Sequence, residues 1–229
     1  MELTARENSV WYLKRNRLFE RISDEVVGGC CELFVQRTFR KRAVLFEQGD
    51  PARMVYLVKR GKVRISRTTE DGKEITVAVL GEGDIFGEEV VFSPDVVRTT
   101  QATCLEDSYL CMSRMQDIYG IMARNPLIAL NIAKYLSEQR DDALTAVEEI
   151  SSLKVPDRLV RLFERMAEDH GVPARGGTRV DVRLTHAQIA SLIGSTRETV
   201  SLELSNLVRA GRLALEGGFI VLPGAIAKT

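Results

Sequence analysis

The chain has 229 residues, enough for one large domain or two small ones with buried cores. Its 32 basic and 32 acidic side chains give a formal net charge of zero, which excludes an overall electrostatic attraction to nucleic acid; a DNA-binding face would have to be local. The first residues lack the apolar core of a signal peptide, and no stretch has the composition of a membrane span. We therefore expect a cytoplasmic protein without a membrane partner.

The first part of the chain changes from a helical to a β-type pattern near residue 38. Residues 8–36 are predicted to be helical because apolar side chains recur among polar ones. From 38 to about 112, short β-rich runs are separated by turn sequences containing Gly and Asp. The clearest runs lie at residues 44–46, 54–58, 63–65 and 75–80. Regular short strands with tight turns are typical of a β-roll or jelly roll.

A long helix is predicted from Asn125-Pro126 to about Ile150, a stretch that contains no Gly and no further Pro. Its small and branched side chains recur at alternating steps of four and three, the spacing of a coiled-coil seam. The seam consists of Ala129, Ala133, Leu136, Arg140, Ala143, Val147 and Ile150. This pattern favours a parallel homodimer over packing of the helix on its own barrel. Arg140 would then pair with Asp141 or Asp142 of the second chain.

A second domain is predicted after residues 151–156, which break the helical pattern and have the composition of a hinge. An amphipathic helix follows, with apolar side chains between Leu159 and Met166. Residues 171–177 are predicted to be a loop because they are rich in Gly, Pro and Arg. A strand is expected from Val180 to Leu184.

Two short helices joined by a glycine turn are predicted next. Thr185 opens a capping box, and the first helix ends at Gly194, a residue type that tolerates a left-handed turn. Ser195 repeats the N-cap signal three residues before a glutamate, with Thr196 as the alternative cap. The apolar face of the second helix consists of Val200, Leu204 and Leu207. This arrangement is a helix-turn-helix, whose second helix is expected to enter the major groove of DNA.

The end of the chain completes a winged helix. Two apolar runs, 213–215 and 219–222, flank Gly217-Gly218 and predict a tight hairpin. The sequence thus predicts an α+β fold with three parts: an N-terminal β-roll (jelly-roll) sensor domain at 1–124, a long dimerisation helix with its hinge at 125–154, and a C-terminal winged helix-turn-helix domain at 155–229. The predicted DNA-binding residues are Thr185, Ser195, Thr196, Arg197, Glu198 and Ser201.

A ligand-binding cassette is predicted around Gly87 and Arg98. Gly87 permits close approach of the backbone to a ligand, and the amides that follow it can face an anion. Arg98 offers a planar, permanently charged fork for a phosphate, and Thr99 adds a hydroxyl donor. Glu88 is an acceptor that suits a ribose hydroxyl. The combination suggests a cyclic nucleotide; the alternative is that Glu88 and Arg98 pair with each other across a β-turn.

Taken together, these motifs resemble the CRP/FNR family of transcription regulators over nearly the whole chain. The resemblance rests on Phe86-Gly87-Glu88, Arg98-Thr99, Asn125-Pro126, Val155-Pro156-Asp157-Arg158 and Arg197-Glu198-Thr199-Val200. It implies a homodimer, not an enzyme, that binds a palindromic TGTGA-like site when cyclic AMP occupies the β-roll. It also implies RNA polymerase as a partner. No metal, heme or iron–sulfur cluster is expected.

The resemblance assigns roles to residues of the cassette and the recognition helix. Gly87 and Glu88 would hold the ribose, Arg98 and Thr99 the cyclic phosphate, and Arg197 and Glu198 the base edges. The whole predicted ligand site comprises Gly87, Glu88, Glu89, Arg98, Thr99, Arg140, Ala143 and Leu144.

Four positions depart from the pattern of the cyclic-AMP-binding members. Ala143 and Leu144 stand where those members carry a Thr-Ser pair that reads adenine, and Gln139 replaces an Arg near the phosphate. In the recognition helix Leu202 replaces a second Arg, so one guanine contact should be missing. Ser201 resembles the FNR branch, whose N-terminal cysteine cluster is absent from this sequence.

The four cysteines are expected to be free thiols with structural roles; they are Cys30, Cys31, Cys104 and Cys111. Cys104 and Cys111 flank a predicted β-turn, so they could approach each other across a hairpin. Two alternatives to gating by cyclic AMP stay open. One is a family member that binds DNA without a ligand, or under another effector or cysteine redox control. The other, a nucleotide-binding module of an enzyme, is disfavoured because the sequence shows no catalytic triad, metal-ligand cluster or P-loop.

Overall fold

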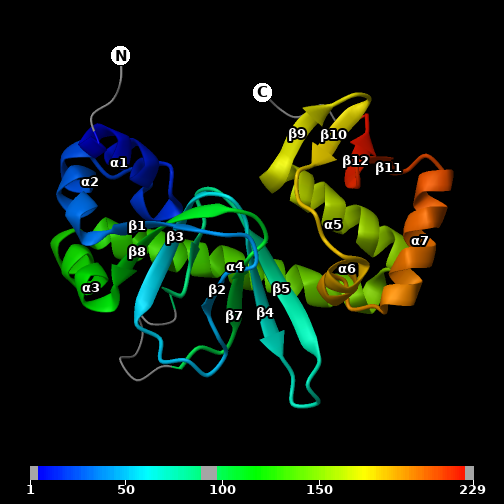
Figure 1. Cartoon of the computed structure of the whole chain (residues 1–229), viewed down its shortest axis with the longest axis horizontal. Coiled ribbons are helices and arrows are strands. Elements are labelled where there is room, and N and C mark those ends of the chain that lie inside the picture. Colours follow the sequence, from blue (N-terminus) through cyan, green and yellow to red (C-terminus); the bar gives the residue numbers. More distant parts are fainter. Residues whose placement is uncertain (1–4, 89–96, 225–229) are drawn as a thin grey trace. The chain divides into compact units, whose positions relative to one another are not determined.

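The structure is a computed structural model that describes residues 5–88 and 97–224. The chain divides into two units (Figure 1). The first consists of Met1–Glu74 and Ala78–Arg140, and the second of Ile75–Val77 and Asp141–Thr229. The boundary near Arg140 lies inside the long helix, whereas the sequence placed its boundaries at the two ends of that helix. The predicted domain limits therefore stay a prediction.

Eight strands and several helices form the described part of the first unit. The helices are α1 (Ala5–Lys14), η1 (Arg17–Phe19), α2 (Asp24–Cys30), η2 (Cys31–Leu33), α3 (Met115–Arg124) and α4 (Pro126–Ser152), the last of which continues into the second unit. The strands are β1 (Val35–Phe39), β2 (Val44–Phe46), β3 (Met54–Arg60), β4 (Val63–Thr68), β5 (Glu74–Leu80), β6 (Ile85–Phe86), β7 (Gln101–Cys104) and β8 (Ser108–Arg114). They form two four-stranded sheets, in the orders β1-β8-β3-β6 and β2-β7-β4-β5.

Strand β3 is buried on both faces because it separates two apolar cores. Tyr56 and Val58 lie in a core shared by the two sheets, the interior of the roll. Val55 and Leu57, which alternate with them, pack instead into a core built with the N-terminal helices, α3 and α4. Successive side chains of a strand point to opposite faces, so one apolar run serves both cores. The structure confirms the predicted strands at 44–46, 54–58, 63–65 and 75–80.

Residues 8–36 are largely helical, as predicted, except that β1 begins at Val35. The structure breaks this stretch into α1, η1, α2 and η2, and β1 then pairs along its length with β8. The side chain of Asn16 accepts a hydrogen bond from the backbone N–H of Leu18, and that of Ser23 accepts one from Val26. Such side chains bond the backbone locally and start new helical turns instead of continuing one.

The expectation that Cys104 and Cys111 meet across a hairpin is also wrong. Cys104 ends β7 in one sheet and Cys111 lies in β8 of the other. Each forms part of the buried core on its own strand, and the structure has all four cysteines as free thiols. Burial raises the pKa of the Cys104 thiol, and it raises that of Cys111 to about 11. A protonated, buried thiol is a poor nucleophile, so these two cysteines are placed for packing.

The second unit is a winged helix-turn-helix, as predicted. Its elements are the end of α4, α5 (Val155–His170), β9 (Gly171–Ala174), β10 (Gly177–Val180), α6 (His186–Leu192), α7 (Arg197–Arg209), β11 (Ala214–Glu216) and β12 (Phe219–Pro223). The four strands form one antiparallel sheet in the order β11-β12-β10-β9, and α5 packs against β10 and α7. The wing turns at Gly217 and Gly218, both of which have positive φ, as a two-residue hairpin turn requires.

Two boundaries in this unit differ from the prediction. Residues 171–174 form β9, not a loop, and β10 ends at Val180, so the expected strand from Val180 to Leu184 is wrong. Gly176 has φ +90° and closes a hairpin between β9 and β10, with Thr178 paired to Pro173. Pro lies here on the edge strand, where its missing N–H costs no sheet hydrogen bond.

The long helix α4 is confirmed, from Pro126 to Ser152. Its first half packs into the core of the first unit through Ile128, Ile132 and Tyr135. Further along, Leu144 and Val147 are 60% and 62% exposed. Large apolar side chains at such exposure form an apolar stripe without a covering element in a single chain.

Candidate ligand site and DNA interface

Arg98 is the best-defined residue of the predicted cassette. It is 2% exposed, and its guanidinium donates to the backbone carbonyls of Gly87 (3.1 Å) and Met54 (2.5 Å). The charged group also lies over the ring of Phe46, 4.2 Å from its centroid. The backbone of Arg98 is fixed in turn by Asp50, whose carbonyl accepts its N–H at 2.8 Å. Arg98 therefore joins β2, β3 and the Gly87 backbone into one framework.

Gly87 is required by this framework for two reasons. Its φ is +76°, a conformation that L side chains rarely adopt. A Cβ on Gly87 would also lie 2.8 Å from Nη1 of Arg98 and 2.9 Å from the carbonyl oxygen of Met54. The sequence predicted that Gly87 allows a close approach. The structure shows such an approach, and the group that comes close is the guanidinium of Arg98.

A cavity of about 360 Å³ opens beside the Arg98 framework. The residues that line it are Leu45, Phe46, Asp50, Pro51, Arg53, Met54, Tyr56 and Arg98. Its mixture of aromatic and apolar walls with a few charged groups is typical of small-molecule sites, which begin at about this volume. Except for Arg98, sequence reasoning missed these residues, because they lie on β2, β3 and the turn between them, with no motif to mark them.

The other predicted ligand residues have different surroundings. Glu88 is half-buried and Thr99 is exposed, and both lie next to a residue of the framework. Glu89 lies outside the described residues. Arg140, Ala143 and Leu144 are exposed on α4, at and beyond the boundary between the two units. These last three therefore stay a prediction as ligand contacts.

The helix-turn-helix has the caps that its sequence indicates, with one correction. Thr185 and Gln188 form the capping box: the Thr185 hydroxyl accepts from the Gln188 N–H at 3.2 Å, and the Gln188 side chain accepts from the Thr185 N–H at 2.8 Å. The N-cap of α7 is Thr196, the alternative, and not Ser195. Thr196 accepts from the Thr199 N–H at 3.2 Å, and it is in extended conformation, as a cap requires.

Helix α7 has one buried and one exposed face. Val200, Leu204 and Leu207 are buried as predicted. The exposed side chains on the opposite face are Arg197, Glu198, Ser201, Leu202 and Ser205. His186, at the start of α6, lies 3.0 Å from the Ser201 hydroxyl through its Nδ1. This contact ties the predicted base-reading face to α6; no sequence signal could have found it, since the partners are on different helices.

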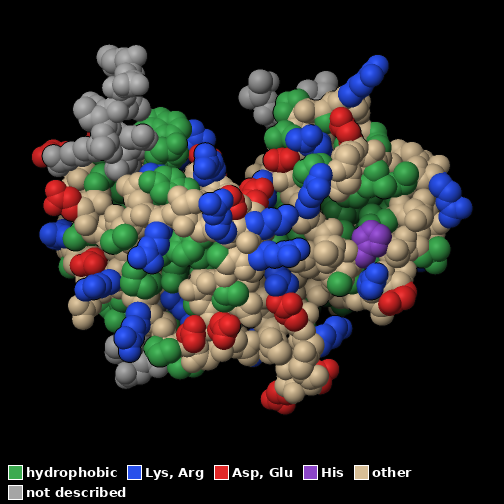
Figure 2. Space-filling view, viewed as in Figure 1, with side chains coloured by type: hydrophobic (Ala, Val, Ile, Leu, Met, Phe, Trp, Pro, Cys, Tyr) green, Lys and Arg blue, Asp and Glu red, His purple; other side chains and the backbone are tan. Residues whose placement is uncertain are grey.

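Two basic side chains from outside the wing pack against it. Arg179 and Arg183 lie over Phe219, 4.8 Å and 4.4 Å from the centroid of its ring. Arg183 also donates to the carbonyl of Gly217 at 2.8 Å, which fixes it against the wing turn. Elsewhere on the visible face of the molecule, basic and acidic side chains are interspersed, in keeping with the balanced net charge (Figure 2).

The comparisons with known proteins cover both units. The sequence profile of the cyclic nucleotide-binding domain matches residues 36–125, and that of the Crp-like helix-turn-helix domain matches residues 157–223. The chain is 30% identical over 211 residues to a global nitrogen regulator of Synechocystis, covering 92% of each chain. The chain belongs to the CRP/FNR family of transcription regulators. As a CRP/FNR regulator it combines a cyclic nucleotide-binding domain with a DNA-binding helix-turn-helix.

Other CRP/FNR relatives show how varied the group is. The chain is 30% identical over 208 residues to the cyclic AMP receptor protein of Thermus thermophilus, covering 91% of this chain and 93% of that one. Its fold matches the c-di-GMP responsive global regulator CLP of Xanthomonas campestris with a TM-score of 0.76, at 23% identity, over 89% of this chain and 100% of the other. The family is one of DNA-binding transcription regulators.

Two further findings on the described residues concern membrane-spanning helices and metal-binding groups. None of their helices has both the length and the apolar character needed to cross a membrane. Within the same residues, no group of three or more His, Cys, Asp or Glu side chains is placed to hold a metal ion.

Proposed function

We propose that this CRP/FNR chain is a homodimeric regulator that binds a palindromic TGTGA-like site more tightly when cyclic AMP occupies the β-roll. The observation that carries the ligand assignment is the Arg98 framework. A buried guanidinium lies beside a cavity and against Gly87, where a Cβ would clash with it. Arg is suited to phosphate because its planar fork forms paired hydrogen bonds to two oxygens. Thr99 supplies a hydroxyl beside it, and Glu88 an acceptor for the ribose.

The relatives support a nucleotide ligand and show why its identity needs a test. One relative is named as a cyclic AMP receptor protein and another as a cAMP-activated regulator, whereas a third is named as a nitrogen regulator. In this chain Ala143 and Leu144 are apolar and cannot donate or accept hydrogen bonds through their side chains. These two side chains would offer adenine apolar contact and no hydrogen bond, and we expect weaker base selection than a hydroxyl pair would give.

The proposed dimer rests on the exposed apolar stripe of α4. Val147 and Ile150 are exposed in the single chain, and a second α4 would cover them at coiled-coil spacing. In the DNA-binding unit, the exposed positions of Arg197 and Glu198 at the N-terminus of α7 suit major-groove contacts to guanine and cytosine. Activation of transcription would further require contact with RNA polymerase.

Calorimetric titration of the full chain with cyclic AMP tests the ligand assignment. Thr99→Val should weaken the binding of cyclic AMP by roughly tenfold or more, because one hydrogen bond to a charged phosphate is lost. Thr99 is exposed, so this variant should fold normally, and the neighbouring Thr100→Val is the matched control with wild-type affinity. Absence of cyclic AMP binding to the wild-type chain would favour the second candidate, a family member that binds DNA without this ligand or under another effector.

A further inference from the structure

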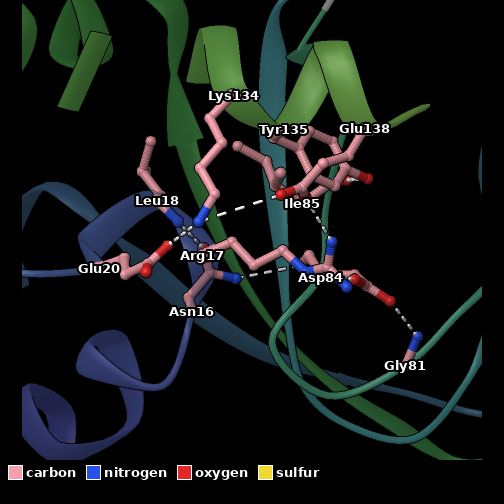
Figure 3. A network of polar contacts seen from close by, with 10 residues as sticks. All are labelled: Asn16, Arg17, Leu18, Glu20, Gly81, Asp84, Ile85, Lys134, Tyr135 and Glu138. Carbon is pink, nitrogen blue, oxygen red and sulfur yellow. Dashed lines mark hydrogen bonds and ion pairs between the residues drawn. The ribbon is translucent and has the colours of Figure 1, made fainter. Parts of the chain in front are cut away.

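The segment Gly83–Gly87, here called the ligand segment, leads into the Arg98 framework and is bonded to α4 as well as to the sheet. The hydroxyl of Tyr135, on α4, donates to the backbone carbonyl of Ile85 at 2.7 Å (Figure 3). Tyr135 is 4% exposed and Ile85 is 2% exposed, so water does not replace this bond readily. Ile85 lies two residues before Gly87, the glycine whose carbonyl receives the Arg98 guanidinium.

A second set of contacts connects the same segment to residues 16–20. Asn16 is buried; its side-chain oxygen accepts from the Leu18 N–H, and its amide group donates to the Asp84 carbonyl at 3.1 Å. The backbone N–H of Arg17 donates to the Gly83 carbonyl, also at 3.1 Å. We call Asn16–Glu20 the strap. Its first two residues, Asn16 and Arg17, are hydrogen-bonded to the ligand segment.

The strap is bonded to α4 at its other end. Asn131 donates through its side chain to the carbonyls of Leu18 (3.0 Å) and Glu20 (2.9 Å). Lys134 pairs with Glu20 at 2.8 Å, and Arg17 pairs with Glu138 at 3.1 Å (Figure 3). The ion pairs are 43–57% exposed and contribute little, because solvent screens them. The buried bond of Tyr135 and the better shielded, part-buried bonds of Asn16 and Asn131 hold the geometry.

We infer that Tyr135 is a positioning residue: it holds the ligand-approaching backbone in a fixed place on α4, so that a change at Gly87 is transmitted to α4. The inference rests on the proposed function, because the change is supplied by cyclic AMP. A ligand that accepts hydrogen bonds from the Arg98 guanidinium must alter the hydrogen bonds that this group donates to the carbonyls of Gly87 and Met54. The Ile85 carbonyl moves with Gly87, and the Tyr135 bond responds. Helix α4 carries both Tyr135 and the exposed apolar stripe near Val147. A displacement of Tyr135 is therefore inferred to displace the stripe as well.

The first test measures coupling in the full chain. The probe is a labelled TGTGA-type duplex, and the quantity is the ratio of its dissociation constants without and with cyclic AMP. Tyr135→Phe keeps the ring in the core and removes one hydroxyl. It should lower the ratio by roughly twofold to tenfold, the equilibrium effect of one hydrogen bond. Tyr109→Phe is the matched control: it removes a hydroxyl that donates to Gln36 at 2.6 Å, away from the ligand segment. An unchanged ratio in Tyr135→Phe, with cyclic AMP still bound, overturns the inference.

A second test needs no ligand and separates this inference from the proposed function. Hydrogen exchange in residues 126–140 of α4 is compared between wild type, Gly87→Ala, Tyr135→Phe and the double variant. Gly87→Ala disturbs the ligand segment, and its effect on α4 exchange should shrink once Tyr135 has lost its hydroxyl. Equal effects of Gly87→Ala in both backgrounds would overturn the inference. One further outcome is that wild type shows no response to cyclic AMP while the effect of Gly87→Ala on α4 exchange still depends on the Tyr135 hydroxyl. That result would refute cyclic AMP as the ligand and would leave the positioning role of Tyr135 supported.

Discussion

Gly87→Ala is the substitution that tests the Arg98 framework most sharply, and Gly72→Ala is its matched control. Both glycines have positive φ, +76° and +80°, so alanine is strained by roughly 1–2 kcal/mol at each. Only at Gly87 does the new Cβ meet neighbours, at 2.8 Å from Arg98 and 2.9 Å from Met54, whereas at Gly72 nothing lies within 4 Å. Overpacking of this kind adds about 1–3 kcal/mol. We expect Gly87→Ala to lower the free energy of unfolding by about 2–5 kcal/mol and Gly72→Ala by about 1–2.

The chain offers a selective assay for this comparison. Its single tryptophan is Trp11, in α1 of the first unit, so urea unfolding followed by tryptophan fluorescence reports on that unit. The entropic gain from replacing glycine in the unfolded chain is common to both variants and cancels in their difference. Equal destabilisation by the two substitutions would refute the close approach of Arg98 to Gly87. A larger loss at Gly87, accompanied by weaker binding of cyclic AMP, would support both the framework and its role.

Three further predictions concern DNA, the dimer and the buried thiols. Arg197→Ala should cost about 1–3 kcal/mol at one base pair of the half-site, whereas an equal loss on random DNA would make Arg197 a phosphate contact. Val147→Asp with Ile150→Asp should give monomers in sedimentation, while Leu215→Asp, an exposed apolar position on the wing, leaves dimers; dimers in the double variant would refute the α4 interface. Because the folded pKa of Cys111 is raised to about 11, its contribution to stability is complete below the unfolded thiol pKa, roughly 8.5, and is lost as pH rises through the folded value. Between pH 8 and pH 11, urea unfolding should therefore show a smaller loss of unfolding free energy in Cys111→Ala than in wild type. Equal losses would contradict the raised pKa of the Cys111 thiol.

The fold could be predicted where local patterns and tertiary packing agree. The glycine-bounded strands, the long helix and the capped helices around Gly194 all follow from spacing and caps, and the structure has each of them. Residues 8–36 were predicted to be helical and largely are, but their uneven apolar spacing did not show that Asn16 and Ser23 cap separate helical turns. The prediction failed at 171–174, because a strand whose partner is supplied by β10 carries no apolar alternation of its own.

The site was predictable only in the residues whose chemistry is visible in the sequence. Gly87 and Arg98 could be singled out because one allows unusual backbone and the other carries a fixed charge. The cavity wall could not, since Leu45 and Arg53 line one cavity only when the sheet that holds β2 and the sheet that holds β3 pack together. The Tyr135 bond to Ile85 joins residues fifty positions apart, and a tyrosine on an apolar helix face reads as core until its hydroxyl partner is known.

Fluorescence anisotropy tests whether cyclic AMP in the β-roll controls DNA binding by the winged helix. A labelled palindromic TGTGA-type duplex is titrated with the full chain, with and without cyclic AMP, at a single salt concentration, with a scrambled duplex of equal length alongside. We expect cyclic AMP to tighten binding to the palindrome and to have much less effect on the scrambled duplex. Equally tight, sequence-specific binding with and without cyclic AMP would contradict this expectation.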